Sequence, residues 1–183
     1  MRKLAITCTA ILALGSGTAQ AAQPCLTPVE ASALAAYALP SAITGTTKRC
    51  APTLAPGAFL RNGGADLANR YAARKAANWP GAKQAFIKIG GVSKDEGMAM
   101  LTALPDPSLQ QLLDTMIEGV VAQQIPTERC GEIDRIVGLL APLPPQNTAD
   151  LVAVMLGLAG KSGKSGKSGK VDSGKFSICK SST

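Results

Sequence analysis

The stretch DPSLQQLLDTMIEGVVAQQIP, residues 106–126, carries the clearest helical periodicity in the chain. Asp106 stands where a helix N-cap belongs, and Pro107 follows it at the first helical position. The apolar side chains recur every three or four residues and fall on one stripe: Leu109, Leu112, Leu113, Met116, Ile117, Val120 and Val121. The opposite face is polar, with Gln110, Asp114, Glu118 and Gln124. The stretch therefore predicts an amphipathic helix whose polar face is solvated.

Similar helix signals recur on both sides of this stretch. In TPVEASALAAYAL, residues 27–39, Thr27 and Glu30 have the spacing of a capping box, and we expect this helix to end before Pro40. Residues 63–91 predict a further helix, interrupted at Trp79 and Pro80. The apolar patterns of residues 130–142 and of the segment after Asn147 predict two more. The sequence thus predicts an all-α fold, an irregular bundle of five to six short helices with prolines at the turns.

The first 21 residues have the pattern of a secretory signal peptide. Arg2 and Lys3 precede an apolar run over residues 4–14, which is too short to span a bilayer, and residues 19–21 read Ala-Gln-Ala. We expect cleavage after residue 21, a helical domain over residues 22–160, and a periplasmic or secreted product with no transmembrane segment.

Four cysteines follow the expected cleavage site: Cys25, Cys50, Cys130 and Cys179. An even number of cysteines in an exported chain predicts two disulfides, for which three connectivities exist. We expect the pairs Cys25–Cys50 and Cys130–Cys179, because the first pair brackets one helix and its return, while the apolar residues before Cys179 are able to dock beside Cys130. The chain has no histidine and no Cys-x-x-Cys pair, so we expect no metal site and no cofactor.

Charge divides the chain into a neutral body and a cationic end. Residues 22–160 hold eleven basic and eleven acidic side chains, so the body lacks the electrostatic footprint of specific nucleic-acid binding. Residues 161–175 read as a flexible Lys-Ser-Gly linker, and residues 176–183 as a segment that docks on the body. The linker is either a solubilising spacer or a contact to an anionic envelope surface, made by Lys161, Lys164, Lys167 and Lys170.

Gly-Lys-Ser, the tripeptide that ends a nucleotide-binding P-loop, occurs three times over residues 160–168. A P-loop requires a further glycine five residues before the glycine that precedes lysine, and Met155, Leu158 and Lys161 occupy those positions. The repeat therefore predicts no nucleotide site.

Two sets of side chains in the body are candidates for chemistry or binding. Asp114 and Glu118 lie one helical turn apart, as paired carboxylates of an acid-catalysed hydrolase or lyase do, although a solvated helix face explains them as well. The preferred binding candidate is a set able to hold a phosphate or carboxylate with cations and aromatic rings: Arg70, Tyr71, Arg74, Lys75 and Trp79. Its alternative is an Asp66–Arg70 ion pair with the aromatic rings in the core.

Three segments together resemble a group of small exported bacterial proteins that carry no assigned activity. They are residues 25–43 with the cysteine that follows them, Cys50, then residues 55–80 and residues 133–160. The resemblance implies an exported helical domain and supplies no catalytic residues. The sequence therefore favours a non-enzymatic exported protein that acts by binding or by envelope association. The alternatives are a carboxylate-based hydrolase or lyase, and an inhibitor or chaperone-like protein whose exposed apolar groove between helices takes a protein partner.

Overall fold

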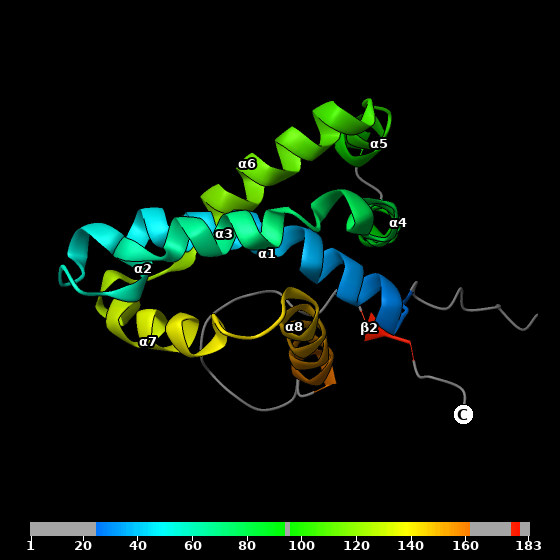
Figure 1. Ribbon diagram of the computed structural model, residues 1–183. Coiled ribbons are helices and arrows are strands. Elements are labelled where there is room, and N and C mark those ends of the chain that lie inside the picture. Colours follow the sequence, from blue (N-terminus) through cyan, green and yellow to red (C-terminus); the bar gives the residue numbers. More distant parts are fainter. Residues whose placement is uncertain (1–24, 94–95, 162–176, 180–183) are drawn as a thin grey trace, which may run out of the picture.

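The computed structural model describes residues 25–93, 96–161 and 177–179, and within them it confirms the all-α fold (Figure 1). Eight α-helices lie in these ranges: α1 (Pro28–Cys50), α2 (Phe59–Asn62), α3 (Gly64–Ala72), α4 (Lys75–Ser93), α5 (Glu96–Thr102), α6 (Asp106–Gln124), α7 (Cys130–Leu140) and α8 (Pro145–Lys161). The 3-10 turns η1 (Ala51–Thr53) and η2 (Thr127–Arg129) and the two-residue strands β1 (Cys25–Leu26) and β2 (Ser177–Ile178) complete the described chain.

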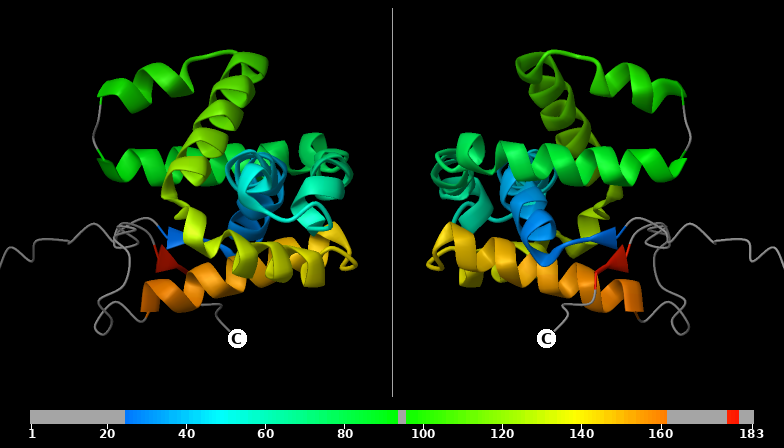
Figure 2. Two further views of the ribbon diagram at one scale, coloured as in Figure 1. Left: turned by 90° about the vertical axis from the view of Figure 1, so that its left-hand side faces the viewer. Right: turned by 90° about the vertical axis from the view of Figure 1, so that its right-hand side faces the viewer.

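Helix α1 is the centre of the bundle, and α3, α4, α6 and α8 all pack against it (Figure 2). Its capping box is formed as predicted, because the Thr27 hydroxyl accepts from the Glu30 amide at 3.2 Å and the Glu30 carboxylate accepts from the Thr27 amide at 2.9 Å. Tyr37, in the middle of α1, is only 1% exposed. The longest helix therefore serves as the shared surface on which the other four are positioned.

The predicted end of this helix at Pro40 is wrong, because α1 continues through Pro40 to Cys50. A proline inside a helix costs about 3 kcal/mol through a lost hydrogen bond and a clash with the preceding turn. Burial of the residues after Pro40 offsets this cost, since Ile43, Gly45 and Cys50 are all buried. Helix α4 likewise runs through Pro80, so the predicted interruption there is wrong, and the break lies instead between Ala72 and Lys75.

Two disulfides form, as predicted, but the predicted pairing is wrong. Cys25 is bonded to Cys179, and Cys50 to Cys130. The error follows from the length of α1, which at 23 residues extends about 34 Å and carries Cys50 far from Cys25. Residues 177–179 do dock on the body, but on β1: the strands pair in parallel, and the Cys179 amide donates to the Leu26 carbonyl at 2.8 Å.

Several predictions from the sequence concern residues outside the described ranges. The signal peptide over residues 1–21 lies there, as do Lys164, Lys167 and Lys170 of the linker, while Lys161 is the last residue of α8. Among the described helices, none is both long enough and apolar enough to cross a membrane.

Candidate functional site: an apolar groove on α1

A row of alanines on α1 forms the floor of an apolar groove. The row contains Ala31, Ala35, Ala38 and Ala42, whose spacing of four, three and four residues places them on one helix face. Helix α4 lines the groove with Trp79, Ala82, Phe86 and Ile89. Helix α6 lines it with Leu113, Met116, Ile117, Val120 and Val121. The rest of the lining is Leu34, Tyr37 and Leu39 of α1, Leu26 of β1 and Val152 of α8. The cavity has a volume of about 470 Å³, and we call it the α1 groove.

Contacts along α1 show how the two wall helices are placed. Tyr37 packs against Trp79 and Ala82 of α4 and against Leu113 of α6, in one cluster at the middle of α1. From there α4 runs back toward Ala31, which shares a cluster with Ala85. Helix α6 runs the other way, toward Gly45, whose Cα faces the carbonyl of Glu118. The α1 groove is therefore elongated along α1.

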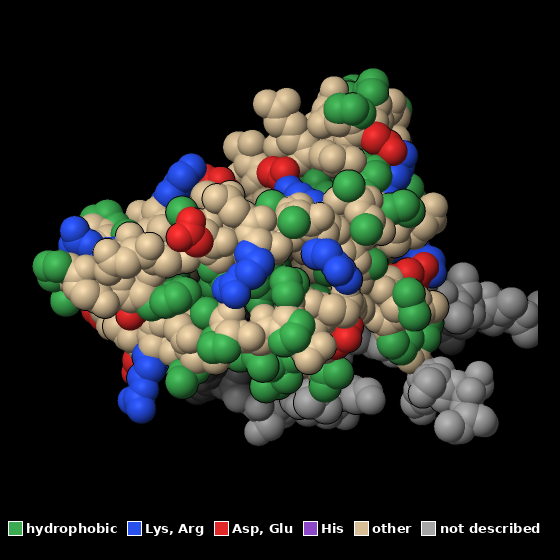
Figure 3. All heavy atoms as spheres, in the orientation of Figure 1, with side chains coloured by type: hydrophobic (Ala, Val, Ile, Leu, Met, Phe, Trp, Pro, Cys, Tyr) green, Lys and Arg blue, Asp and Glu red, His purple; other side chains and the backbone are tan. Residues whose placement is uncertain are grey.

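The apolar stripe predicted on α6 is only partly covered. Leu109 and Leu113 are buried, whereas Met116 and Val120 remain 48% and 55% exposed beside the α1 groove. A second group of exposed apolar side chains lies on α7 and α8, where hydrophobic side chains gather along the lower part of the molecule (Figure 3): Ile136, Leu139, Leu151, Val154 and Met155. The first group lines a concave surface, and this concavity distinguishes it from the second.

Four ion pairs join the three helices around the α1 groove. Glu30 of α1 pairs with Lys88 of α4 at 2.6 Å, and Lys48 of α1 pairs with Glu118 of α6. Helices α4 and α6 are joined twice, by Lys75–Asp114 and by Lys83–Asp106, the latter at 2.5 Å. These pairs join the polar edges of the helices, whose apolar faces meet at Tyr37.

The electrostatic effect of these pairs is largest on Glu30 and Asp106. The hydrogen bond from Lys88, together with the amide of Thr27, holds the pKa of Glu30 below its ordinary value. Lys83 and the indole N–H of Trp79, which donates to Asp106 at 2.9 Å, lower the pKa of Asp106. Both carboxylates are therefore charged at neutral pH.

The predicted N-cap role of Asp106 is wrong, because Asp106 is the first helical residue and Pro105 precedes it as the cap.

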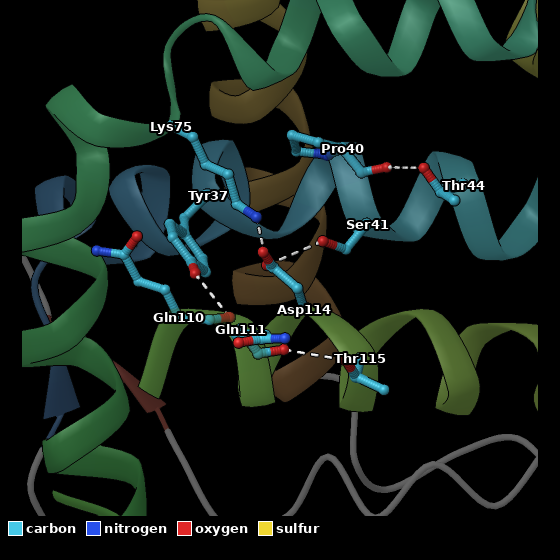
Figure 4. Close-up of polar contacts among 9 residues, drawn as sticks. All are labelled: Tyr37, Pro40, Ser41, Thr44, Lys75, Gln110, Gln111, Asp114 and Thr115. Carbon is cyan, nitrogen blue, oxygen red and sulfur yellow. Dashed lines mark hydrogen bonds and ion pairs between the residues drawn. The ribbon is translucent and has the colours of Figure 1, made fainter. Parts of the chain in front are cut away.

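A polar cluster surrounds Tyr37 where the three helices meet (Figure 4). The Lys75 ammonium lies 4.6 Å from the centre of the Tyr37 ring and pairs with Asp114, which also accepts from the Ser41 hydroxyl at 3.0 Å. The Tyr37 hydroxyl donates to the Gln110 carbonyl at 3.3 Å. Burial and the neighbouring Asp114 charge raise the pKa of Tyr37 above its ordinary value, so this phenol is protonated at neutral pH and is no general base.

Asp114 and Glu118, the predicted carboxylate pair, do not act as a pair, because each is bound to a different lysine. Asp114 is bound to Lys75 and Ser41, while Glu118 is bound to Lys48, so each carboxylate has its own counter-charge. The solvated face expected for them is formed only in part, since both side chains are about one-third exposed and both contact α1. The described residues contain no group of three or more cysteine or carboxylate side chains able to hold a metal ion.

The predicted binding set does not form one site. Tyr71 is buried in a cluster with Leu67 and donates to Thr148 at 2.8 Å, whereas Trp79 lies in the separate Tyr37 cluster. Arg70 donates to the Ala141 carbonyl at 2.8 Å. Arg74 is exposed between α3 and α4. Lys75 and Trp79 do adjoin the α1 groove, and a phosphate- or carboxylate-binding role for the set stays a prediction.

The comparisons with known proteins leave the family open. No protein-family model matches the chain, and no curated protein or solved structure shows significant similarity to it. The resemblance to small exported bacterial proteins stays a prediction. A function must therefore rest on the chemistry of the α1 groove itself.

Proposed function

We propose that this chain is an exported, non-enzymatic binding protein whose α1 groove holds an apolar ligand. One observation carries the proposal: the groove has a volume of about 470 Å³, and every residue that lines it is apolar or contributes an aromatic ring. Ligand sites commonly have volumes of about 300 to 1,000 Å³ and mostly apolar walls. An apolar molecule removed from water into this groove gains roughly 25 cal/mol for each Å² of its surface that is buried.

The side chains next to the α1 groove favour binding over catalysis. Asp106, Asp114, Glu30 and Glu118 are each paired with a lysine, and Tyr37 is protonated at neutral pH. A general base needs a free proton-accepting group within hydrogen-bonding distance of its substrate. These paired groups stabilise the walls of the groove and leave its interior without such a base.

Export is part of the proposal and is supported by two features. Residues 1–21 have the signal-peptide pattern, and two disulfides join the four remaining cysteines. Disulfides persist in oxidising compartments such as the bacterial periplasm. Contact of Lys161, Lys164, Lys167 and Lys170 with an anionic envelope surface is a separate proposal, independent of the groove.

The test of the proposed function is to fill the groove. Ala38→Phe places a ring in the middle of the alanine row, so we expect the affinity for an apolar dye such as N-phenylnaphthylamine to fall by at least about tenfold, or about 1.4 kcal/mol. Ala77→Phe is the matched control, because Ala77 is exposed on α4 and does not line the groove. Dye fluorescence titration measures both, with circular dichroism to verify folding. Equal losses in the two folded variants, or none in either, would refute the proposal.

A further inference from the structure

The geometry of the α1 groove points to a particular class of ligand. This inference rests on the proposed function. We propose that the ligand is a single unbranched hydrocarbon chain, whose polar end remains in water and is not recognised by the protein. The two halves of this inference come from different observations, one from the shape of the groove and one from the charges at its edges.

The shape of the groove matches an extended chain. Ala31 and Ala42, the ends of the alanine row, are eleven residue steps apart on the helix, or about 16 Å. An extended chain of single bonds advances about 1.2 Å per bond, judged from the extended polypeptide, so the floor accommodates roughly 13 bonds. Leu34, Tyr37 and Leu39 of α1 also line the groove and flank the alanine row. A long floor that is walled by α4 toward Ala31 and by α6 toward Ala42 fits a linear chain better than a compact ring system.

The interior of the groove has no means of recognising a polar group. The alanine row supplies methyl groups, and the other lining side chains are aliphatic or carry the rings of Tyr37, Trp79 and Phe86. The polar atom of Tyr37 is directed to the Gln110 carbonyl, and that of Trp79 to Asp106. A polar group placed inside would lose its hydrogen bonds to water without replacement, which is unfavourable. The buried part of the ligand is therefore hydrocarbon alone.

The charges around the groove cancel in pairs. Lys75, whose ammonium lies over the Tyr37 ring, is bound to Asp114, and Lys88, next to the lining residue Ile89, is bound to Glu30. Lys83, next to Ala82, is bound to Asp106. A ligand head group of either sign would have to break one of these pairs to gain a partner of opposite charge. Head-group charge should thus contribute little to affinity.

A homologous series tests this inference with the full exported chain. Alkyl carboxylates, alcohols and trimethylammonium ions of about 8 to about 16 carbons are titrated calorimetrically below their micelle concentrations. Each added methylene should raise the affinity roughly fourfold, until the chain reaches about 12 to 14 carbons and the gain stops. At equal chain length, the three head groups should differ by less than about threefold.

A variant with one end of the groove closed makes the test specific. Ala42 is the last alanine of the row, about 6 Å from Ala38 along the helix. Ala42→Phe should move the end of the affinity gain to chains about five carbons shorter, while the gain per methylene in shorter chains is unchanged.

The outcomes separate the two proposals. Affinity that does not rise with chain length, a carboxylate that binds more than about tenfold tighter than the alcohol, or an unchanged limit in folded Ala42→Phe would overturn the chain inference. The proposed function would still hold after any of these outcomes, provided that the dye binds and that Ala38→Phe blocks its binding. Failure of every probe, the dye included, would overturn both.

Discussion

Replacing Cys50 and Cys130 together by alanine is expected to lower the free energy of unfolding by about 4 kcal/mol. The bond closes a loop between residues 80 apart, and by chain entropy such a closure removes much of the freedom of the unfolded chain. Both sulfurs are buried in a cluster with Leu60, which is itself fully buried, so lost packing adds to the effect. Equilibrium unfolding in urea measures the difference.

The other disulfide supplies the control. Cys25 and Cys179 are only partly buried, and their bond joins β1 to the residue that follows β2, both strands being two residues long. Chain entropy alone would favour the longer loop, in which the two cysteines are 154 residues apart. Replacing both by alanine should nevertheless cost less, because β1 and β2 are so short that they regain freedom in the folded protein as well as in the unfolded chain. A Cys50/Cys130 double variant as stable as the unaltered protein would contradict the buried position assigned to this bond.

The second large effect is expected from Gly45→Ala. A Cβ atom at Gly45 would lie 2.5 Å from the carbonyl oxygen of Glu118, which belongs to the backbone of α6. A backbone atom cannot turn aside as a side chain does, so α1 and α6 must separate. We expect the free energy of unfolding to fall by about 2 to 3 kcal/mol, the upper part of the range for overpacked sites. Urea or thermal unfolding provides the measurement.

The same substitution at Gly119 should change the free energy of unfolding in the opposite direction. It follows Glu118 in α6, but a Cβ atom there would have no neighbour within 4 Å. Alanine inside a helix is favoured over glycine, so Gly119→Ala should stabilise the protein by about 0.5 to 1 kcal/mol. If Gly45→Ala stabilised the protein as well, the close approach of α1 and α6 would be wrong.

Local sequence signals were sufficient for most helices. The capping box at Thr27 and Glu30 located the start of α1, because its hydrogen bonds depend on neighbours three residues apart. The end of α1 was missed because the penalty at Pro40 is local, whereas the burial of Ile43 and Cys50 that outweighs it depends on distant helices. The wrong disulfide pairing followed directly, since a helix ending at residue 39 would have allowed Cys50 to return to Cys25.

An apolar groove between helices was named in one alternative, but its position on α1 was missed for a different physical reason. Periodicity identifies which face of a helix is apolar, but it treats alanine as equivalent to leucine. Alanines at positions 31, 35, 38 and 42 mark an apolar face whose side chains are too small to fill the space beside it. The ion pairs of Asp114 and Glu118 also could not be predicted from the neighbouring sequence, because Lys75 and Lys48 belong to other helices.

The most direct measurement of the central claim is where a bound hydrocarbon chain lies. An alkyl carboxylate of about 12 carbons with a photoreactive diazirine at its far end is bound, irradiated and located by peptide mass spectrometry. The account predicts labelling of the groove segments of α1, α4 and α6, which include Ala38, Phe86 and Val120, and loss of that labelling in Ala38→Phe. Labelling concentrated instead on the exposed apolar side chains of α7 and α8, such as Leu139 and Met155, and unchanged in Ala38→Phe, would contradict it.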